Sequence, residues 1–196
     1  YTGEGDVTKQ VDLLRAVPFK DQAKITSALA FDMKHALTRT GFQAQLEAGE
    51  EAKSYTATVT NIAITGVKNK GTLNLDTGVW TLDGTSTADY ALTVTKGINT
   101  TGGNHSFNTG TTADFTARAL NSDDSYMMLM PQVLGTAPKL SITVNYTGGV
   151  MNETVTSDFD LKDLLVDGSG EWKAGKGVTY MIKIKGKFVN IAVYTW

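Results

Sequence analysis

The chain has no cysteine, three prolines, two histidines and no marked excess of either charge. The lack of cysteine excludes disulfides, thiolate nucleophiles and zinc–thiolate sites, but it leaves the redox compartment open. With 18 basic and 20 acidic side chains the net charge is −2, so no overall basic field favours nucleic acid. The longest apolar run, 126–130, covers about five residues, whereas a membrane span needs roughly 18–20. Bulk nucleic-acid binding and a transmembrane segment are therefore not expected.

At 196 residues the chain is long enough for one large β domain or two smaller ones. It opens at Tyr1 without an initiator methionine, a basic segment or an apolar segment of the kind that directs secretion. We therefore expect a mature chain or a fragment.

Threonine is abundant, and glycine occurs 20 times. Threonine is β-branched and suits the pleated, half-exposed surface of a sheet, whereas a helix restricts its side chain. Apolar and polar residues alternate with a period of two along most of the chain, and turn residues separate these runs. The sequence therefore predicts an all-β fold of antiparallel strands arranged as β-sandwiches.

Two hairpins are the clearest local predictions. In 71–82 the turn Asp76-Thr77-Gly78 separates two short strands, and in 178–193 the turn lies at Gly186-Lys187. The alternating run 25–37 predicts a further strand. Two segments, 7–16 and 160–166, have the spacing of short helices, although each could equally be an irregular connection.

Residues 96–112 are rich in glycine, asparagine and threonine and carry few apolar side chains that could form a core. We place a domain boundary in this stretch. The expected organisation is an N-terminal β-sandwich domain over 1–98 and a C-terminal one over 99–196.

The residue types that carry catalysis or metal binding are not clustered. His35 and His105 lie far apart, and neither has neighbours with metal-ligand spacing. The segment 170–176 has the GxxxxGK spacing of a phosphate loop, but Gly177 follows it where Ser or Thr is needed, and then comes a strand pattern rather than a helix. We expect a hairpin there, with Trp172 against the core. The sequence predicts no catalytic residue, no cofactor and no metal.

Three tryptophans, Trp80, Trp172 and Trp196, together with seven tyrosines, would form a sugar-stacking platform if they were exposed together. Two of the three adjoin strand patterns, where an aromatic side chain usually packs on the core. A β-sandwich glycosidase would instead need two carboxylates facing each other across a cleft.

Four segments together resemble the fimbrillin-like proteins of Bacteroidales, which are subunits and accessory proteins of type V pili. They are LAFDMKHALTRTGFQAQL (29–46), ITGVKNKGTLNLDTGVW (64–80), YMMLMPQVLGTAPKLSITVNY (126–146) and WKAGKGVTYMIKIKGKFVNIAVYTW (172–196). The order and spacing of the four are more specific than any one of them. The sequence departs from the family pattern at Arg39 and Thr40, where small or apolar residues are more usual, and in lacking the family's lipidated cysteine.

The resemblance implies two transthyretin-like antiparallel β-sandwich domains in tandem, the first without some of its N-terminal strands, and no enzymatic activity. It also implies a cell-surface location, in the fimbrium or at the outer membrane, with any lipid anchor outside this chain. The implied partners are other pilus subunits, and a host or bacterial surface protein or glycan. In the family, subunits join by donor-strand exchange, in which a groove opened by processing receives a terminal strand from a neighbour.

The C-terminal strand suits that role. Val189, Ile191 and Val193 share one face, and their burial at roughly 1.5–3 kcal/mol each would supply about 5 to 9 kcal/mol. We therefore predict a donor strand that forms the subunit interface through Phe188, Val189, Ile191, Val193 and Trp196. The same strand could instead complete its own domain as a hairpin partner of 178–185. The function predicted is a non-enzymatic fimbrial subunit or adhesin, and the alternative is a carbohydrate-binding adhesin or tip protein that uses exposed aromatic residues.

Overall fold

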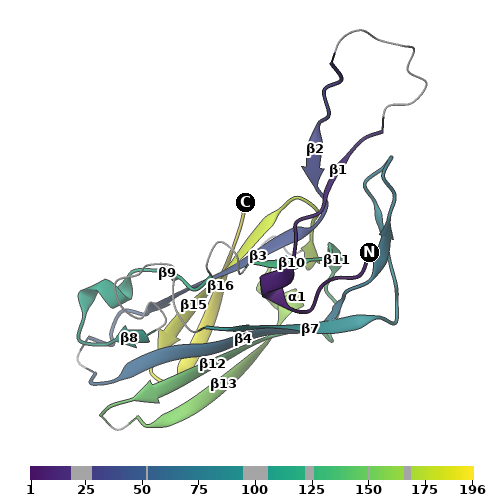
Figure 1. The fold of residues 1–196 in the computed structure, drawn as a ribbon. Helices are drawn as coiled ribbons and strands as arrows, with labels where there is room; N and C mark the ends of the chain where they lie inside the picture. The colour runs from purple at the N-terminus through teal and green to yellow at the C-terminus, as the bar shows by residue number, and fades with distance from the viewer. Residues whose placement is uncertain (19–27, 52, 95–105, 122–125, 150, 166–168) are drawn as a thin grey trace.

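A computed structural model describes residues 1–18, 28–51, 53–94, 106–121, 126–149, 151–165 and 169–196. Two β-sheets packed face to face form the body of the molecule, and two thin hairpins extend from one end of it (Figure 1). Helices are limited to short turns. The predicted all-β class is confirmed.

The first sheet is antiparallel throughout, with strand order β13-β12-β4-β7, and β8 also pairs with β4. Its strands are β4 (Thr56–Lys68), β7 (Thr87–Thr93), β8 (Ser106–Asn108), β12 (Lys139–Thr147) and β13 (Glu153–Asp160). The period-two pattern places Ile62 opposite Ile142 and Ile64 opposite Leu140, all four fully buried. These cross-strand pairs form part of the face of the sheet that packs in the core.

The second sheet has strand order β10-β3-β15-β16, and β9 also pairs with β3. Its strands are β3 (Thr38–Leu46), β9 (Arg118–Ala119), β10 (Met127–Leu129), β15 (Gly177–Lys185) and β16 (Phe188–Thr195). The central pair β3–β15 is parallel and the other pairs are antiparallel. Even-numbered residues of β3 and β15, such as Phe42 and Tyr180, are buried in the core, so the odd-numbered ones, such as Arg39 and Thr179, lie on the outer face.

One continuous hydrophobic core fills the space between the sheets. Its largest fully buried side chains come from both sheets and from the short strand β14 (Glu171–Trp172): Trp172, Tyr90, Tyr146, Tyr180, Phe42 and Phe107. Close packing of this aromatic-rich core supplies the main stabilisation of the fold.

The expected division into two sandwich domains at residues 98/99 is not the arrangement found. The boundary itself lies outside the described residues, but strands from both sides of it share both sheets: β4 pairs with β12, and β3 pairs with β15. Neither half of the chain encloses a core of its own, because the single core takes side chains from both. The strands on either side of the polar stretch, β7 and β8, both pair with β4 in one sheet, so the stretch does not separate two domains.

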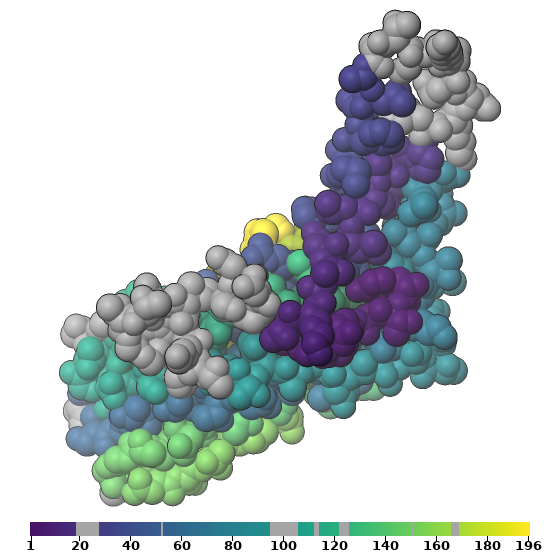
Figure 2. Space-filling view, in the orientation of Figure 1, coloured from purple at the N-terminus to yellow at the C-terminus, as the bar shows by residue number. Residues whose placement is uncertain are grey.

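The two extending hairpins are β1 (Leu14–Ala16) with β2 (Met33–His35), and β5 (Gly71–Leu73) with β6 (Trp80–Leu82) (Figures 1 and 2). The β5–β6 hairpin confirms the prediction for 71–82, and Gly78 adopts the positive φ of 75° that its turn requires. The strand predicted over 25–37 is present only as β2, and Ile25 lies outside the described residues. The extended hairpins carry exposed apolar side chains, namely Leu14, Val17, Leu29, Phe31, Met33, Leu75 and Val79.

The remaining elements are short. They are the 3₁₀ turns η1 (Val7–Lys9) and η2 (Thr112–Phe115), the helix α1 (Leu161–Leu164), and the paired strands β11 (Gln132–Val133) and β14 (Glu171–Trp172). The helix proposed for 7–16 is thus reduced to η1, because β1 begins a few residues later. The one proposed for 160–166 corresponds to α1, which contacts both β13 and β16.

Candidate functional site

β16 is an edge strand whose outer backbone groups are unused. The Gly177–Trp196 pair exchanges two backbone hydrogen bonds, of 2.9 and 3.0 Å. Hydrogen-bonded and non-hydrogen-bonded pairs alternate along an antiparallel ladder, so the N–H and C=O groups of Val189, Ile191 and Val193 point away from β15, as do those of Thr195. Within the described part of the chain these outward groups have no hydrogen-bond partner. They form a row that could pair with another strand.

Two other edge strands, β13 of the first sheet and β10 at the opposite edge of the second, are protected in ways that β16 is not. β13 carries Glu153, Asp158 and Asp160 along its length. The Met128 backbone N–H of β10 donates to Gln10 Oε1 at 2.7 Å, so the N-terminal segment caps that edge. β16, with the sequence FVNIAVYT, contains no charged residue, proline or glycine. Because exposed, uncharged edges recruit further strands, β16 is the candidate joining edge.

The residues predicted for the donor strand divide between the two faces of β16. Val189 and Val193 are buried in the core of their own sandwich, and Ile191 is partly buried. Phe188 and Trp196 lie on the outer face, 75% and 61% exposed. In this structure the strand forms a hairpin with β15, which is the alternative that the sequence left open.

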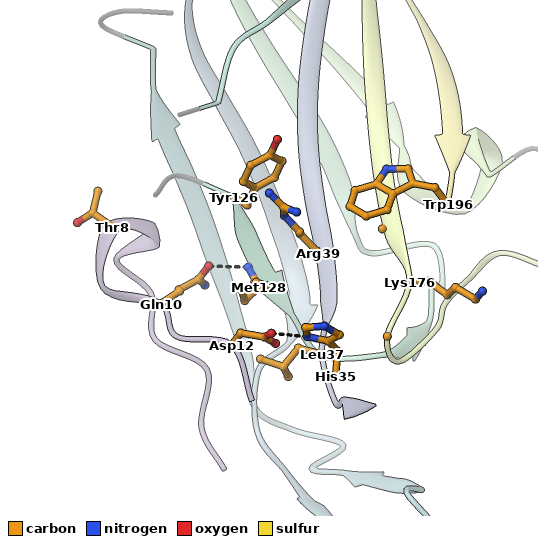
Figure 3. Close-up of a pocket in the computed structure, with 12 residues that line it drawn as sticks. Thr8, Gln10, Asp12, His35, Leu37, Arg39, Tyr126, Met128, Lys176 and Trp196 are labelled. Carbon is orange, nitrogen blue, oxygen red and sulfur yellow. Dashed lines mark hydrogen bonds and ion pairs between the residues drawn. The ribbon is translucent and has the colours of Figure 1, made fainter. Parts of the chain in front are cut away.

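A pocket of about 520 Å³ lies on the outer face of the second sheet, between β3, the C-terminal residue and the N-terminal segment (Figure 3). We call it the Arg39 pocket; the side chains that matter most are Gln10, Asp12, Arg39, Tyr126, Lys176 and Trp196. Strand register places Met128, Arg39, Gly177 and Trp196 side by side across four strands. The sheet therefore fixes the floor of the pocket.

Arg39 lies between two aromatic rings (Figure 3). Its guanidinium carbon is 3.6 Å from the ring centroid of Tyr126 and 5.6 Å from that of Trp196. Glycines make room for both rings, because a β-carbon at Gly41 would lie 2.7 Å from the Tyr126 ring and one at Gly177 would overlap the indole of Trp196. Cation–π contacts thus orient the guanidinium while its N–H groups remain available.

Among the described residues, the acidic side chain of the pocket has a charged partner and the two basic ones do not. His35 Nδ1 contacts the carboxylate of Asp12, so this acid has a partner. Arg39 and Lys176 have no hydrogen bond or ion pair with any described side chain. The pocket therefore presents two cations without a carboxylate partner in the described ranges.

The three tryptophans do not form the platform that the sequence allowed. Trp172 is fully buried, and its Nε1 donates to the Tyr180 hydroxyl at 3.1 Å. It therefore packs against the core, as its position before a strand pattern predicted. Trp80 is partly buried and donates to the Ala36 carbonyl at 2.8 Å. Only Trp196 is exposed, and its neighbours in the pocket, Arg39 and Tyr126, were not anticipated.

The remaining chemical motifs have structural roles. After β14, the GxxxxGK segment turns at Gly175, with φ 69°, and continues into strand β15, as predicted from its sequence. The described residues contain no group of three or more potential metal-ligating His, Asp or Glu side chains, and His105 lies outside them. Asp160 and Asp163 are ion-paired with Lys139 and Lys162, respectively. No described helix has both the length and the apolar character to cross a bilayer.

Two β-sheets packed face to face define a β-sandwich protein. The chain belongs to the fimbrillin-like family, whose family model matches residues 3–195. Among curated proteins no relative matches it.

One solved structure shows the same fold, and others are similar to this chain over part of their length. A fimbrial protein from Bacteroides vulgatus aligns with a TM-score of 0.53 at 20% identity, covering 85% of this chain and 55% of its own. A protein described as a cell adhesion protein, from Bacteroides ovatus, aligns with a TM-score of 0.48 at 15% identity, covering 85% and 46%. The chain thus spans about half the length of the solved structures that it matches.

Proposed function

We propose that the chain is a non-enzymatic fimbrial subunit or adhesin of the cell surface that joins other pilus subunits by strand addition at β16. Membership of the fimbrillin-like family supports the pilus or adhesin role. The description of one structural relative as a fimbrial protein agrees with it. The observation that carries the joining mechanism is the row of outward backbone groups on an edge strand without a charge, proline or glycine.

The geometry favours β16 remaining in its own sheet while it pairs with a neighbour's strand. Leaving the sheet would expose Val189 and Val193, which are buried now, at a cost of roughly 1.5–3 kcal/mol each. It would also break the whole ladder with β15. A strand added on the outer side keeps these interactions and gains a second ladder, in which main-chain hydrogen bonds supply the affinity.

A proline at Thr195 tests this joining edge. Thr195 is exposed and its N–H points outward, so Thr195→Pro removes one donor from the outer row without removing a bond to β15. The probe is a fluorescent peptide with the sequence of residues 188–196 and a lysine tail for solubility. We expect the unmodified chain to bind it and to melt at a higher temperature, and T195P to bind it about tenfold more weakly, since a hydrogen bond and a close backbone approach are both lost.

Thr195→Ala is the matched control, because it shortens the side chain and keeps the N–H. Fluorescence anisotropy gives the affinities, and the far-UV circular dichroism of each variant verifies that the sheet is intact. Absence of peptide binding by the unmodified chain, or equal binding by T195P and T195A, would show that β16 is not the joining edge.

The second candidate, a carbohydrate-binding adhesin, is favoured by a different observation. The Arg39 pocket combines an exposed indole, a tyrosine ring and unpaired cations on a rigid sheet face. Trp80 and Trp172, which the sequence suggested for this purpose, lie outside the pocket.

A further inference from the structure

We propose that the Arg39 pocket binds a saccharide unit that carries a carboxylate, such as a uronic acid or a sialic acid. This inference names a ligand class for the second candidate function. It does not depend on strand addition, because the pocket is formed within one chain.

The pocket has the form of a site for a small ligand. Its volume of about 520 Å³ falls within the roughly 300–1,000 Å³ typical of such sites. The floor is a regular sheet, and Gln10 holds the N-terminal wall by accepting from the Met128 N–H while its Nε2 donates to the Glu4 carbonyl at 2.8 Å. Both floor and wall are thus fixed before a ligand binds.

The charge of the pocket selects an anion. The Arg39 guanidinium lies against the Tyr126 ring, which leaves the N–H groups at its edge free to bind a carboxylate through two parallel hydrogen bonds. Lys176 also lines the pocket, but its exposed ammonium points away from Arg39 (Figure 3), so Arg39 is the cation that binds the carboxylate. Among the described side chains that line the pocket, Asp12 alone carries a carboxylate, and it is already in contact with His35.

The surroundings of the guanidinium favour a sugar ring over a peptide. The face of the Trp196 indole suits the apolar C–H face of a pyranose, and the polar wall formed by Gln10 and Asp12 suits its hydroxyl groups. An extended peptide needs a free strand edge, whereas β3 at the centre of the floor is paired on both sides, with β10 and β15. The pocket lies on a sheet face and not along an edge.

The test separates the contribution of the carboxylate from that of the sugar ring. The ¹⁵N-labelled chain is titrated with methyl β-D-glucuronide, methyl β-D-glucoside, methyl α-N-acetylneuraminide and acetate. The reporter is the indole N–H signal of Trp196, assigned by its loss in W196F. We expect the glucuronide or the neuraminide to bind at least about tenfold more tightly than both the glucoside and acetate, because only a carboxylated sugar uses the cation and the rings together.

Variants assign the effect to the pocket. Arg39→Gln should abolish the preference for glucuronide over glucoside, whereas Lys185→Gln, which removes an exposed charge from the far end of β15, should preserve it. Gly177→Ala keeps every charge but displaces the Trp196 indole, so it should weaken the binding of the carboxylated sugars severalfold. It serves as a second variant if R39Q does not fold. The proposal would be overturned if neither carboxylated sugar bound more tightly than the glucoside, if acetate bound as tightly as the sugars, or if the preference for a carboxylated sugar persisted in R39Q.

Discussion

Trp172→Ala is expected to lower the free energy of unfolding by about 3–5 kcal/mol. Trp172 is fully buried, and its indole N–H donates to Tyr180, so truncation leaves both a cavity and an unpaired hydroxyl. For a domain of this size the loss corresponds to a drop in melting temperature of about 6–20 °C. Urea titration followed by far-UV circular dichroism measures it.

Two further tryptophan variants make the expectation specific. Trp172→Phe keeps an aromatic ring in the core and should cost less than Trp172→Ala. Trp196→Ala removes an indole that is 61% exposed and should cost less than about 1 kcal/mol. If W172A and W196A were equally stable, the assignment of Trp172 to the core would be wrong.

Alkaline pH is expected to unfold the protein steeply, because several tyrosines lie in the core. Burial raises the pKa of Tyr90 and of Tyr146 to about 12, and burial, followed by the neighbouring Glu50, raises the pKa of Tyr55 as well. In the unfolded chain a tyrosine ionises near pH 10. The stabilisation from a buried neutral tyrosine is therefore complete below about pH 10 and is lost as the pH rises through the folded-state pKa, at about 1.4 kcal/mol per pH unit for each residue.

Tyr146→Phe should remove one such contribution. Its hydroxyl is buried and has no hydrogen-bond partner within the described residues, and its ring packs edge-on against Tyr55 at 5.9 Å, a contact that phenylalanine preserves. Stability at pH 7 should be maintained, and the loss between pH 10 and 12 should be less steep by about 1.4 kcal/mol per pH unit. The control is Tyr194→Phe, because Tyr194 is 53% exposed. Chemical denaturation at a series of pH values measures both slopes, and identical slopes for Y146F and Y194F would contradict the prediction.

Local structure was predictable because the signals that produce it are local. The 71–82 hairpin follows from two apolar runs and a glycine at the turn position that needs positive φ, and the 178–193 hairpin follows from the same signal at Gly186, with φ 56°. Strand pairing between the halves of the chain was not predictable, since a period-two pattern identifies the buried face of a strand but not its neighbour. The expected two-domain division was wrong for this reason.

The Arg39 pocket was missed for a related reason. Arg39, Tyr126 and Trp196 are distant in sequence and meet only through the register of β10, β3, β15 and the C-terminal residue. The available signals were weak: two glycines, at positions 41 and 177, that make room for aromatic rings, and an arginine where the family pattern has a smaller residue. None of these signals identifies its partners until the sheet order is known.

The parallel pairing of β3 with β15 has a consequence for biogenesis. During synthesis β3 (Thr38–Leu46) emerges well before β15 (Gly177–Lys185), its central neighbour in the sheet, because most of the other strands lie between them in the sequence. Pairing strands this far apart in sequence makes folding slow. Until β15 pairs with it, β3 has one unpaired edge and an exposed apolar face. We therefore expect the emerging polypeptide to require a holding chaperone until the β15–β16 hairpin has been translated.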